Sequence, residues 1–188
     1  MKIAVLGGGF NPPHMGHLLI CRQVLSFTGN REVWFLPYFQ HPWDKQSIDC
    51  KHRLKMCKLM SSGNIKTFDL EIETRKKNYT FETVVELVKK YPQHDFSWVI
   101  GSDLWPEFLT WEKAHEMLKK IKVLVFPRAG YPVINLQQNV STISNKLTNT
   151  TDISSEKIRE MVRQGLPVDG LVTKAVGDYI KQNKLYLA

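Results

Sequence analysis

The stretch KIAVLGGGFNPPHMGH, residues 2–17, joins an apolar run to a run of three glycines, two prolines and two histidines. The apolar part is typical of a buried strand, and apolar residues at helical spacing follow over residues 16–27. The glycine run therefore lies in a turn between a strand and a helix. Because glycine lacks a Cβ, such a turn can bend tightly and bring its backbone close to a ligand. The spacing matches neither GxGxxG nor GxxxxGK[ST], so the usual dinucleotide and Walker loops do not explain it.

Strand and helix patterns alternate along the rest of the chain. Strands are expected over 32–37, 64–70, 95–101 and 122–126, with another short one near 139–143. Helices are expected over 49–60 with Asp49 as N-cap, and over 80–91, 103–109, 111–119, 154–164 and 172–182. This alternation predicts an α/β fold with right-handed crossovers, in which helices cover both faces of a mostly parallel sheet. We expect one domain over residues 1–188, with a C-terminal helical part over about 153–188.

The composition limits the class of protein. A chain of 188 residues with 43% hydrophobic and 23% charged residues is ordinary for a globular domain, which excludes fibrous and disordered classes. No apolar stretch approaches the roughly 20 residues of a membrane span, and no signal-peptide pattern is visible, so we expect a cytoplasmic protein without a membrane partner. Cys21, Cys50 and Cys57 form no CxxC pair, which favours free thiols in a reducing compartment.

The charge points to an anionic partner. The formal net charge of +8 favours phosphate, nucleotide or nucleic acid, although it also serves solubility. Much of the excess is Lys scattered over expected helix faces. Because no basic stripe interleaved with aromatic residues is present, nucleic acid is not expected as a partner.

His14 and His17 are the residues of the opening stretch whose side chains can bind a ligand. They lie three positions apart around Gly16, so both imidazoles share one face of the first helical turn. Free backbone N–H groups and the positive end of the helix dipole point the same way, which predicts a cradle for a polyphosphate. We expect Gly16 to leave room for the phosphates. The alternatives are two histidines that merely cap a turn, or a zinc site, for which His41, His52 and Cys50 lack recognisable spacing.

GGGFNPPHMGH resembles the first signature of the HxGH nucleotidyltransferases, and ISSEKIREMVRQG at residues 153–165 resembles the ISSxxIR signature of the same superfamily. The intermediate segments LPYFQHPWDK, HRLKMCKLM, YTFETV and VIGSDLWPEFLTW, and the tail LVTKAVGDYIKQNKLY, are similar to the nicotinate mononucleotide adenylyltransferase branch. The resemblance covers nearly the whole chain. It implies a three-layer, Rossmann-like nucleotidyltransferase fold and adenylyl transfer from ATP to nicotinate mononucleotide in NAD biosynthesis, with nicotinamide mononucleotide as a further candidate acceptor.

The resemblance also implies roles for individual residues. The catalytic set is His14, His17, Lys45 and Arg159, which would hold and neutralise the ATP phosphates. The remaining ATP-binding set is Gly8, Gly9, Phe10, Gly16, Gly101, Asp103, Ser154 and Ser155, with Asp103 on the ribose. The mononucleotide would be bound by Asn11, Tyr79, Thr80, Thr83 and Trp111, with Trp111 stacked on the pyridine ring. No protein-held metal is implied, and Mg²⁺ would enter with ATP because it keeps several waters.

The chain departs from the family pattern at several positions. Gly9 replaces the Thr or Ser that often precedes Phe10, and Asn11 stands where Asp is common. KKNYTFET lacks the usual glycine before the tyrosine, and residues 129–151 match poorly. A related nucleotidyltransferase acting on another phosphorylated acceptor and a non-catalytic nucleotide-binding protein therefore remain alternatives. The choice between the two mononucleotides, lid motion and the oligomeric state, a homo-oligomer included, stay open.

Overall fold

The computed structural model describes residues 1–40, 47–75 and 79–187. Its strands are β1 Lys2–Gly8, β2 Glu32–Pro37, β3 Ile65–Thr67, β4 Asp95–Gly101, β5 Lys122–Phe126 and β6 Val140–Thr142. Its helices are α1 Met15–Phe27, α2 Cys50–Met60, α3 Leu70–Thr74, α4 Thr80–Lys90, α5 Trp105–Phe108, α6 Ala114–Leu118, α7 Ser155–Arg163 and α8 Lys174–Gln182. Within the described residues no helix has the length and apolar character needed to cross a membrane.

The strands form one sheet in the order β3-β2-β1-β4-β5-β6, and every pairing in it is parallel. The chain therefore starts in the middle of the sheet, builds outward to β3, and returns to place β4 on the other side of β1. This is the strand order of the Rossmann fold, and the expectation of a parallel α/β sheet is confirmed. The order reverses between β1 and β4, which makes their carboxyl ends the switch point.

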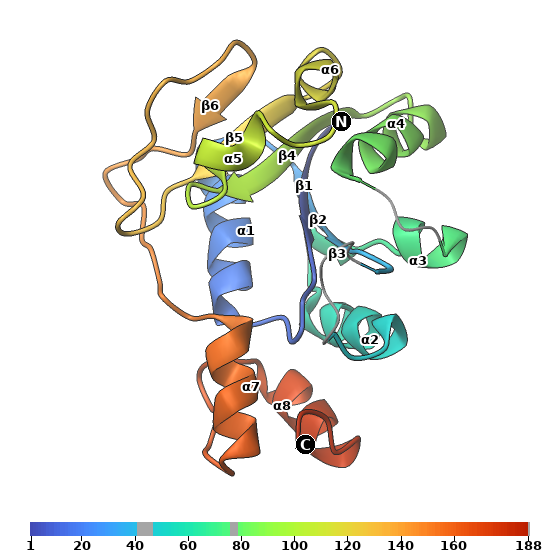
Figure 1. Ribbon diagram of the computed structural model, residues 1–188, viewed down its shortest axis with the longest axis vertical. Helices are drawn as coiled ribbons and strands as arrows, with labels where there is room; N and C mark the ends of the chain where they lie inside the picture. The colour runs from blue at the N-terminus through green and yellow to red at the C-terminus, as the bar shows by residue number, and fades with distance from the viewer. Residues whose placement is uncertain (41–46, 76–78, 188) are drawn as a thin grey trace.

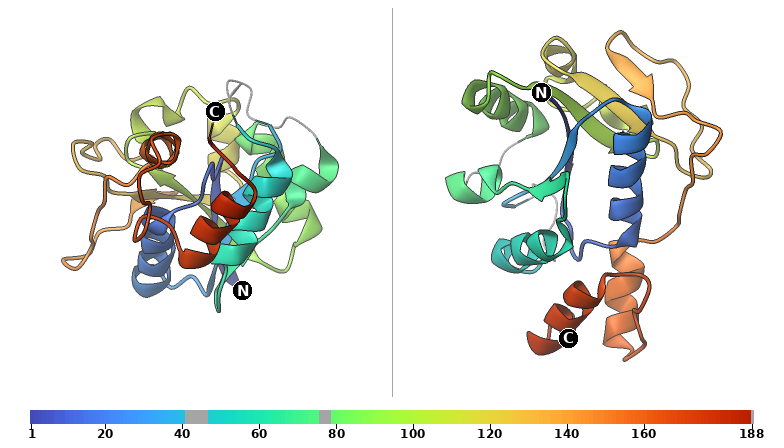
Figure 2. Two further views of the ribbon diagram at one scale, coloured as in Figure 1. Left: turned by 90° about the horizontal axis from the view of Figure 1, so that it is seen from below. Right: turned by 180° about the vertical axis from the view of Figure 1, so that it is seen from behind.

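Helices cover both faces of the sheet, as Figures 1 and 2 show for α1 on one side and α4 on the other. The alternation of β1 explains the layers: Ala4 and Leu6 face the core beneath α1, α2 and α8, whereas Ile3 and Val5 face the core beneath α4, α5 and α6. All four side chains are buried. A strand buried on both faces reads as a continuous apolar run, which is why KIAVL was recognisable.

Two local expectations were wrong. The strand expected over 64–70 ends at Thr67, because the ring of Phe68 turns aside to stack on Trp34 at 3.6 Å between centroids. A short helix, α3, then occupies part of the expected strand and continues beyond it. The helices expected over 103–109 and 111–119 are both shorter than predicted. Helix α6 begins only after Lys113, which adopts a left-handed conformation with φ 55°.

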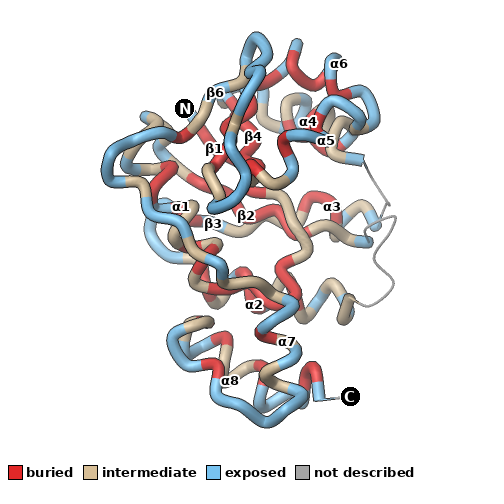
Figure 3. The backbone as a smooth tube through the Cα atoms, turned by 60° about the vertical axis from the view of Figure 1, so that its left-hand side comes forward, coloured by how far each residue is buried: buried red, intermediate tan, exposed pale blue. Residues whose placement is uncertain are grey.

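The C-terminal helices α7 and α8 lie together beyond the carboxyl end of the sheet, next to the start of α1 (Figures 1 and 2). Ile158 of α7 and Val176 and Ile180 of α8 join the core beneath α1. By contrast, the segment between β5 and α7 runs over the surface and is mostly exposed (Figure 3). The chain's last helices are thereby held against its first loop.

Candidate active site

A cavity of about 860 Å³ opens at the carboxyl ends of β1 and β4. It lies at the switch point of the sheet, where ligands of open parallel sheets bind, and its volume suits a nucleotide-sized molecule. Backbone from Gly8 and Gly101 forms its floor, while His14 and His17 come from the start of α1. Ser154 and Ser155 line the cavity from the start of α7.

The two histidines are held by the cap of α1. His14 is the N-cap residue, and its backbone N–H donates to Nδ1 of His17 at 3.1 Å. The two rings lie 3.8 Å apart between centroids, and Phe10 meets the ring of His17 edge-on at 4.9 Å. Because Nδ1 of His17 accepts a hydrogen bond, the ring proton of the neutral imidazole is on Nε2. His17 is therefore set to donate from Nε2.

Both imidazoles are neutral at pH 7. Burial lowers the pKa of His14 to about 4, with a smaller contribution from the positive charge of Arg128. Burial also holds the pKa of His17 well below its ordinary value, and His14 and Arg128 add to the shift. His14 Nδ1 is buried and has no hydrogen-bond partner among the described residues. The pair thus offers directed hydrogen-bonding groups to an anion, not positive charge.

Glycine is required at two positions beside these rings. A Cβ on Gly16 would lie 2.9 Å from Nδ1 of His14 and 3.2 Å from Thr151, so the space we expected for phosphate is filled by the His14 ring. A Cβ on Gly9 would lie 2.6 Å from the hydroxyl of Tyr38. The departure from Thr or Ser at position 9 therefore has a structural cause, because Tyr38 occupies that side-chain position.

The start of α7 is fastened to the opening loop. Ser154 is the N-cap and accepts from the backbone N–H of Lys157 at 3.2 Å. The hydroxyl of Ser155 donates to the carbonyl of Pro12 at 2.8 Å, and Nη1 of Arg159 donates to the carbonyl of Asn11 at 2.8 Å. The two signature segments, far apart in the sequence, are therefore in direct contact at one wall of the cavity.

The turn after β4 carries an ion pair that the sequence did not reveal. Arg128, just beyond β5, donates from Nη1 to Asp103 at 2.8 Å, and its backbone N–H donates to the hydroxyl of Ser102 at 2.8 Å. The other oxygen of Asp103, Oδ1, is buried without a partner among the described residues. Arg128 and Asp103 both line the cavity. Arg128 lies two positions after the end of β5, and this place next to a strand end is the signal in the sequence that points to it.

Tyr79, Thr80 and Trp111 also line the cavity. Thr83 is fully buried instead, and its hydroxyl donates to the carboxylate of Glu71 at 2.6 Å. Glu71 itself lines the cavity, and burial raises its pKa to about 7. Thr83 thus lies behind Glu71, which lines the cavity and which the sequence did not reveal.

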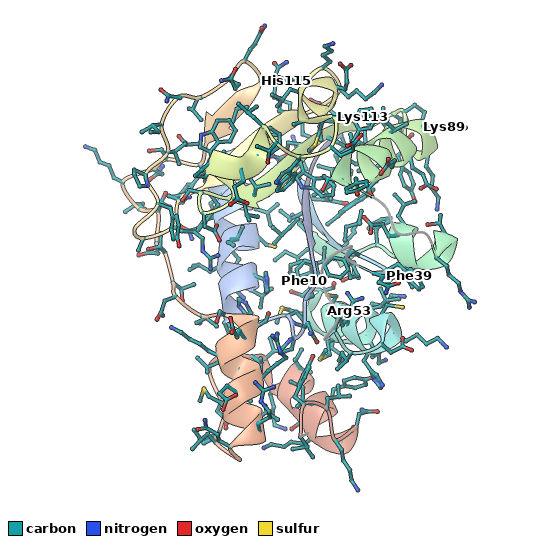
Figure 4. The ribbon with its side chains drawn as sticks, in the orientation of Figure 1. Phe10, Phe39, Arg53, Lys89, Lys113 and His115 are labelled. Atoms are coloured by element: carbon teal, nitrogen blue, oxygen red, sulfur yellow. The ribbon has the colours of Figure 1, made fainter. Side chains whose placement is uncertain are left out.

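Arg53 is a third residue that the sequence did not reveal. Its guanidinium is only 1% exposed and donates to three carbonyls: Gly9 at 2.8 Å, Phe39 at 2.8 Å and Ile48 at 3.2 Å. Figure 4 shows Arg53 close to Phe39, beside the opening loop. No spacing rule signals a buried arginine whose partners are backbone carbonyls.

The predicted site residues fall into three groups. Those that line the cavity are Gly8, His14, Gly16, His17, Tyr79, Thr80, Gly101, Asp103, Trp111, Ser154 and Ser155. Those that do not line it are Gly9, Phe10, Asn11, Thr83 and Arg159. Lys45 lies outside the described residues, as does His41 of the zinc alternative. Within the described part of the chain, no cluster of His, Cys, Asp and Glu is grouped to hold a metal ion.

Residues 5–161 match the family model described as Cytidylyltransferase-like. The chain belongs to the cytidylyltransferase-like family. Nicotinate-nucleotide adenylyltransferase of Bacillus subtilis is 34% identical to it over 190 residues, which cover 98% of each chain. Two structures of Plasmodium falciparum nicotinic acid mononucleotide adenylyltransferase, complexed with NaAD and with APC, match its fold with TM-scores of 0.79 and 0.78. Both are 18% identical, and the matches cover 98% of this chain and 97% and 96% of theirs.

Proposed function

We propose that this cytidylyltransferase-like protein transfers the adenylyl group of ATP to nicotinate mononucleotide and releases pyrophosphate. The similar protein of Bacillus subtilis is named a nicotinate-nucleotide adenylyltransferase, which supports the proposal. The observation that carries the proposal is the cavity at the switch point, where His14 and His17 meet the N-terminal end of α7. Hydrogen-bond donors and helix amides gathered in one concave site suit a polyphosphate.

In the reaction, a phosphate oxygen of the mononucleotide forms a bond to the α-phosphorus of ATP. The bond from that phosphorus to the bridging oxygen of the β-phosphate breaks, and its electron pair leaves with pyrophosphate. No covalent bond to the protein is needed, so catalysis consists of positioning and of stabilising charge. We assign to His17 Nε2–H a hydrogen bond to the α-phosphate that strengthens as charge builds up on its oxygens.

The leaving pyrophosphate needs further donors. Ser154 and Ser155 bring the first-turn amides of α7, and Arg159 lies one turn further along the helix. One Nη of Arg159 already donates to Asn11, which leaves other donors of the guanidinium fork for the β- and γ-phosphates. Lys45, which lies outside the described residues, is proposed as a further cation for the phosphates.

The two nucleosides are proposed to occupy the two ends of the cavity. Asp103 would accept from the hydroxyls of the adenosine ribose, for which its unpartnered Oδ1 is suited. The pyridine ring would stack on Trp111, next to which Glu112 also lines the cavity. A flat aromatic ring and a nearby carboxylate both favour a cationic heterocycle. The carboxylate of nicotinate would meet the amides at the start of α4, where the helix dipole favours a negative charge.

We further propose that the divalent ion is Mg²⁺ and that it enters with ATP, bridging phosphate oxygens while it keeps several waters. The free cysteines Cys21, Cys50 and Cys57 support the proposal that the enzyme works in the reducing environment of the cytoplasm.

One assay tests the function. The protein is incubated with ATP and Mg²⁺, and with nicotinate mononucleotide or nicotinamide mononucleotide in turn, and pyrophosphate and dinucleotide are both measured. We expect stoichiometric formation of both products, faster with nicotinate mononucleotide. Tight ATP binding without either product would instead identify a nucleotide-binding protein, and pyrophosphate formation only with another phosphorylated acceptor would identify a different transferase.

A further inference from the structure

The loop before α1 is held from outside by the C-terminal part of the chain. Arg159 and Ser155 donate to the carbonyls of Asn11 and Pro12, as described above. The backbone N–H of Met15 donates to the carbonyl of Leu171 at 2.8 Å. These contacts fix backbone atoms on either side of His14, so the position of its ring depends on residues more than 140 positions away in the sequence.

Tyr186 adds a contact of a different kind. Its hydroxyl donates to Oδ1 of the Asn11 side chain at 2.9 Å, and this hydrogen bond is buried. Tyr186 is 8% exposed and has a positive φ of 64°, a conformation that costs a non-glycine residue about 1 kcal/mol or more. With this backbone conformation, the ring of Tyr186 is turned inward and its hydroxyl reaches Asn11 in the loop before α1. Burial also raises the pKa of the phenol, so the hydroxyl stays protonated and can donate.

The contact fixes the orientation of the Asn11 side chain. An amide side chain has one oxygen acceptor and one NH₂ group with two donors. Because the hydroxyl of Tyr186 donates to the oxygen, the amide of Asn11 is held in one orientation. The next residue back, Phe10, has a φ of 50° and packs against the ring of His17. A change in the pose of Asn11 is therefore transmitted through Phe10 to His17 as well as along the backbone to His14.

We propose that Tyr186 is a positioning residue for the adenylyl-transfer reaction: its hydroxyl fixes the Asn11 side chain and, through it, the loop that carries both histidines. The expected effect on kcat rests on the proposed function. Tyr186 itself does not line the cavity, so it acts only through Asn11. Misplacing reacting groups by about 1 Å can cost a factor of about 100 in rate, so a single lost hydroxyl can have a large effect.

The test compares Tyr186→Phe with Tyr179→Phe. Tyr179 lies on α8, and its hydroxyl forms a hydrogen bond of 2.9 Å with Nδ1 of His52, away from the opening loop. Both changes remove one tyrosine hydroxyl from the C-terminal part, and we expect similar small falls in the melting temperature. Tyr186→Phe is expected to lower kcat about tenfold, with the KM values for ATP and for the mononucleotide changed less than threefold. Tyr179→Phe is expected to leave all of these within twofold. Equal kcat values for the two variants would overturn the proposal.

A double-mutant cycle with Asn11→Ala tests whether Tyr186 acts through Asn11. If Tyr186 acts through Asn11, Tyr186→Phe has no further effect on kcat in the Asn11→Ala protein. Multiplying effects would show that Tyr186 acts by another route and would also overturn the proposal. Asn11→Ala leaves Tyr186 in place, so it serves as the test if Tyr186→Phe does not fold.

Hydrogen exchange separates this inference from the proposed function. We expect amides of Phe10, Asn11 and His14–His17 to exchange faster in Tyr186→Phe and in Asn11→Ala, and to be unchanged in Tyr179→Phe. These exchange rates can be measured even if the wild-type protein makes no dinucleotide. In that case the proposed function fails, and the exchange rates still test whether Tyr186 positions the loop. Unchanged exchange at these amides in both Tyr186→Phe and Asn11→Ala would overturn the positioning role.

Discussion

At the scale of the residue, His17 offers the cavity one hydrogen, on Nε2, because its Nδ1 accepts from the backbone of His14. A group fixed in this way needs no reorganisation when charge develops on a phosphate oxygen. Removing such a preorganised donor from an enzyme typically costs a factor of about 100 to 1,000 in kcat. We therefore expect His17→Ala to retain its fold and to lose about that factor in kcat, measured as pyrophosphate release at saturating substrates.

His115→Ala is the matched control for this prediction. His115 is exposed on α6, at the top of Figure 4, and does not line the cavity. Its removal should leave kcat unchanged. A His17→Ala protein with wild-type turnover would show that the imidazole is only a helix cap.

The neutral state of His14 has a consequence for stability against acid. Its pKa is about 4 in the folded protein against 6.5 in the unfolded chain, so the unfolded state binds the proton more readily between these pH values. The free energy of unfolding is therefore undiminished by His14 above pH 6.5 and falls as the pH drops toward 4, by about 3 kcal/mol in total. His14→Gln, which cannot take up this proton, should show a smaller loss between pH 7 and pH 4.5 in urea unfolding. Parallel pH profiles for the two proteins would contradict the assignment.

At the scale of the element, α2 contributes to the site through Arg53 and not through its cap or its charged surface. Three carbonyls from three segments converge on this buried guanidinium. Lysine has no planar fork and cannot bond all three, so carbonyls would be left without a donor. We expect Arg53→Lys to lower the free energy of unfolding by about 2–4 kcal/mol in urea denaturation. Arg22→Lys, on the exposed side of α1, is the control and should leave the free energy of unfolding unchanged. An equally small change for Arg53→Lys would show that the three hydrogen bonds of Arg53 do not stabilise the fold.

The elements themselves were largely predictable, for a physical reason. Strands β1, β2, β4 and β5 are buried on both faces, so their sequences are short apolar runs bounded by turn residues. The cap of α2 at Asp49 follows from local hydrogen bonding and is confirmed, because its side chain accepts from the backbone N–H of Lys51. Helix α3 was missed because five residues are too few to show a helical period, and its first leucine extends the apolar run of the preceding strand.

At the scale of the whole molecule, the contacts that complete the site could not be predicted from periodicity. The meeting of the opening loop with α7 was expected only from two signatures read together, and it is confirmed as a contact by the bonds of Ser155 and Arg159. The pairings of Thr83 with Glu71, of Arg128 with Asp103 and of Tyr186 with Asn11 join residues from separate elements. Such pairings depend on how the layers pack, which a one-dimensional pattern does not contain.

The same arrangement predicts that bound ATP contacts residues from both ends of the sequence. His14 and His17 near the start and Ser154 and Ser155 near the end line one cavity, so a triphosphate bound there is expected to contact both groups. A ligand at 100 times its Kd stabilises the folded state by about 2.7 kcal/mol. For a chain of this size that corresponds to a rise in Tm of roughly 5–10 °C. We expect ATP with Mg²⁺ to produce such a rise and to slow hydrogen exchange in both residues 7–17 and residues 153–159.

Ser155→Ala separates this linkage from binding to the opening loop alone. The change removes the hydroxyl that joins α7 to Pro12, so the slowing of exchange by ATP should shrink at residues 153–159 and persist at residues 7–17. Protection by ATP that is confined to residues 7–17 already in the wild-type protein would mean that the phosphates do not reach α7. The roles proposed for Ser154, Ser155 and Arg159 would then be wrong, while that of His17 would stand, because it depends only on the cap of α1 and the ring beside it.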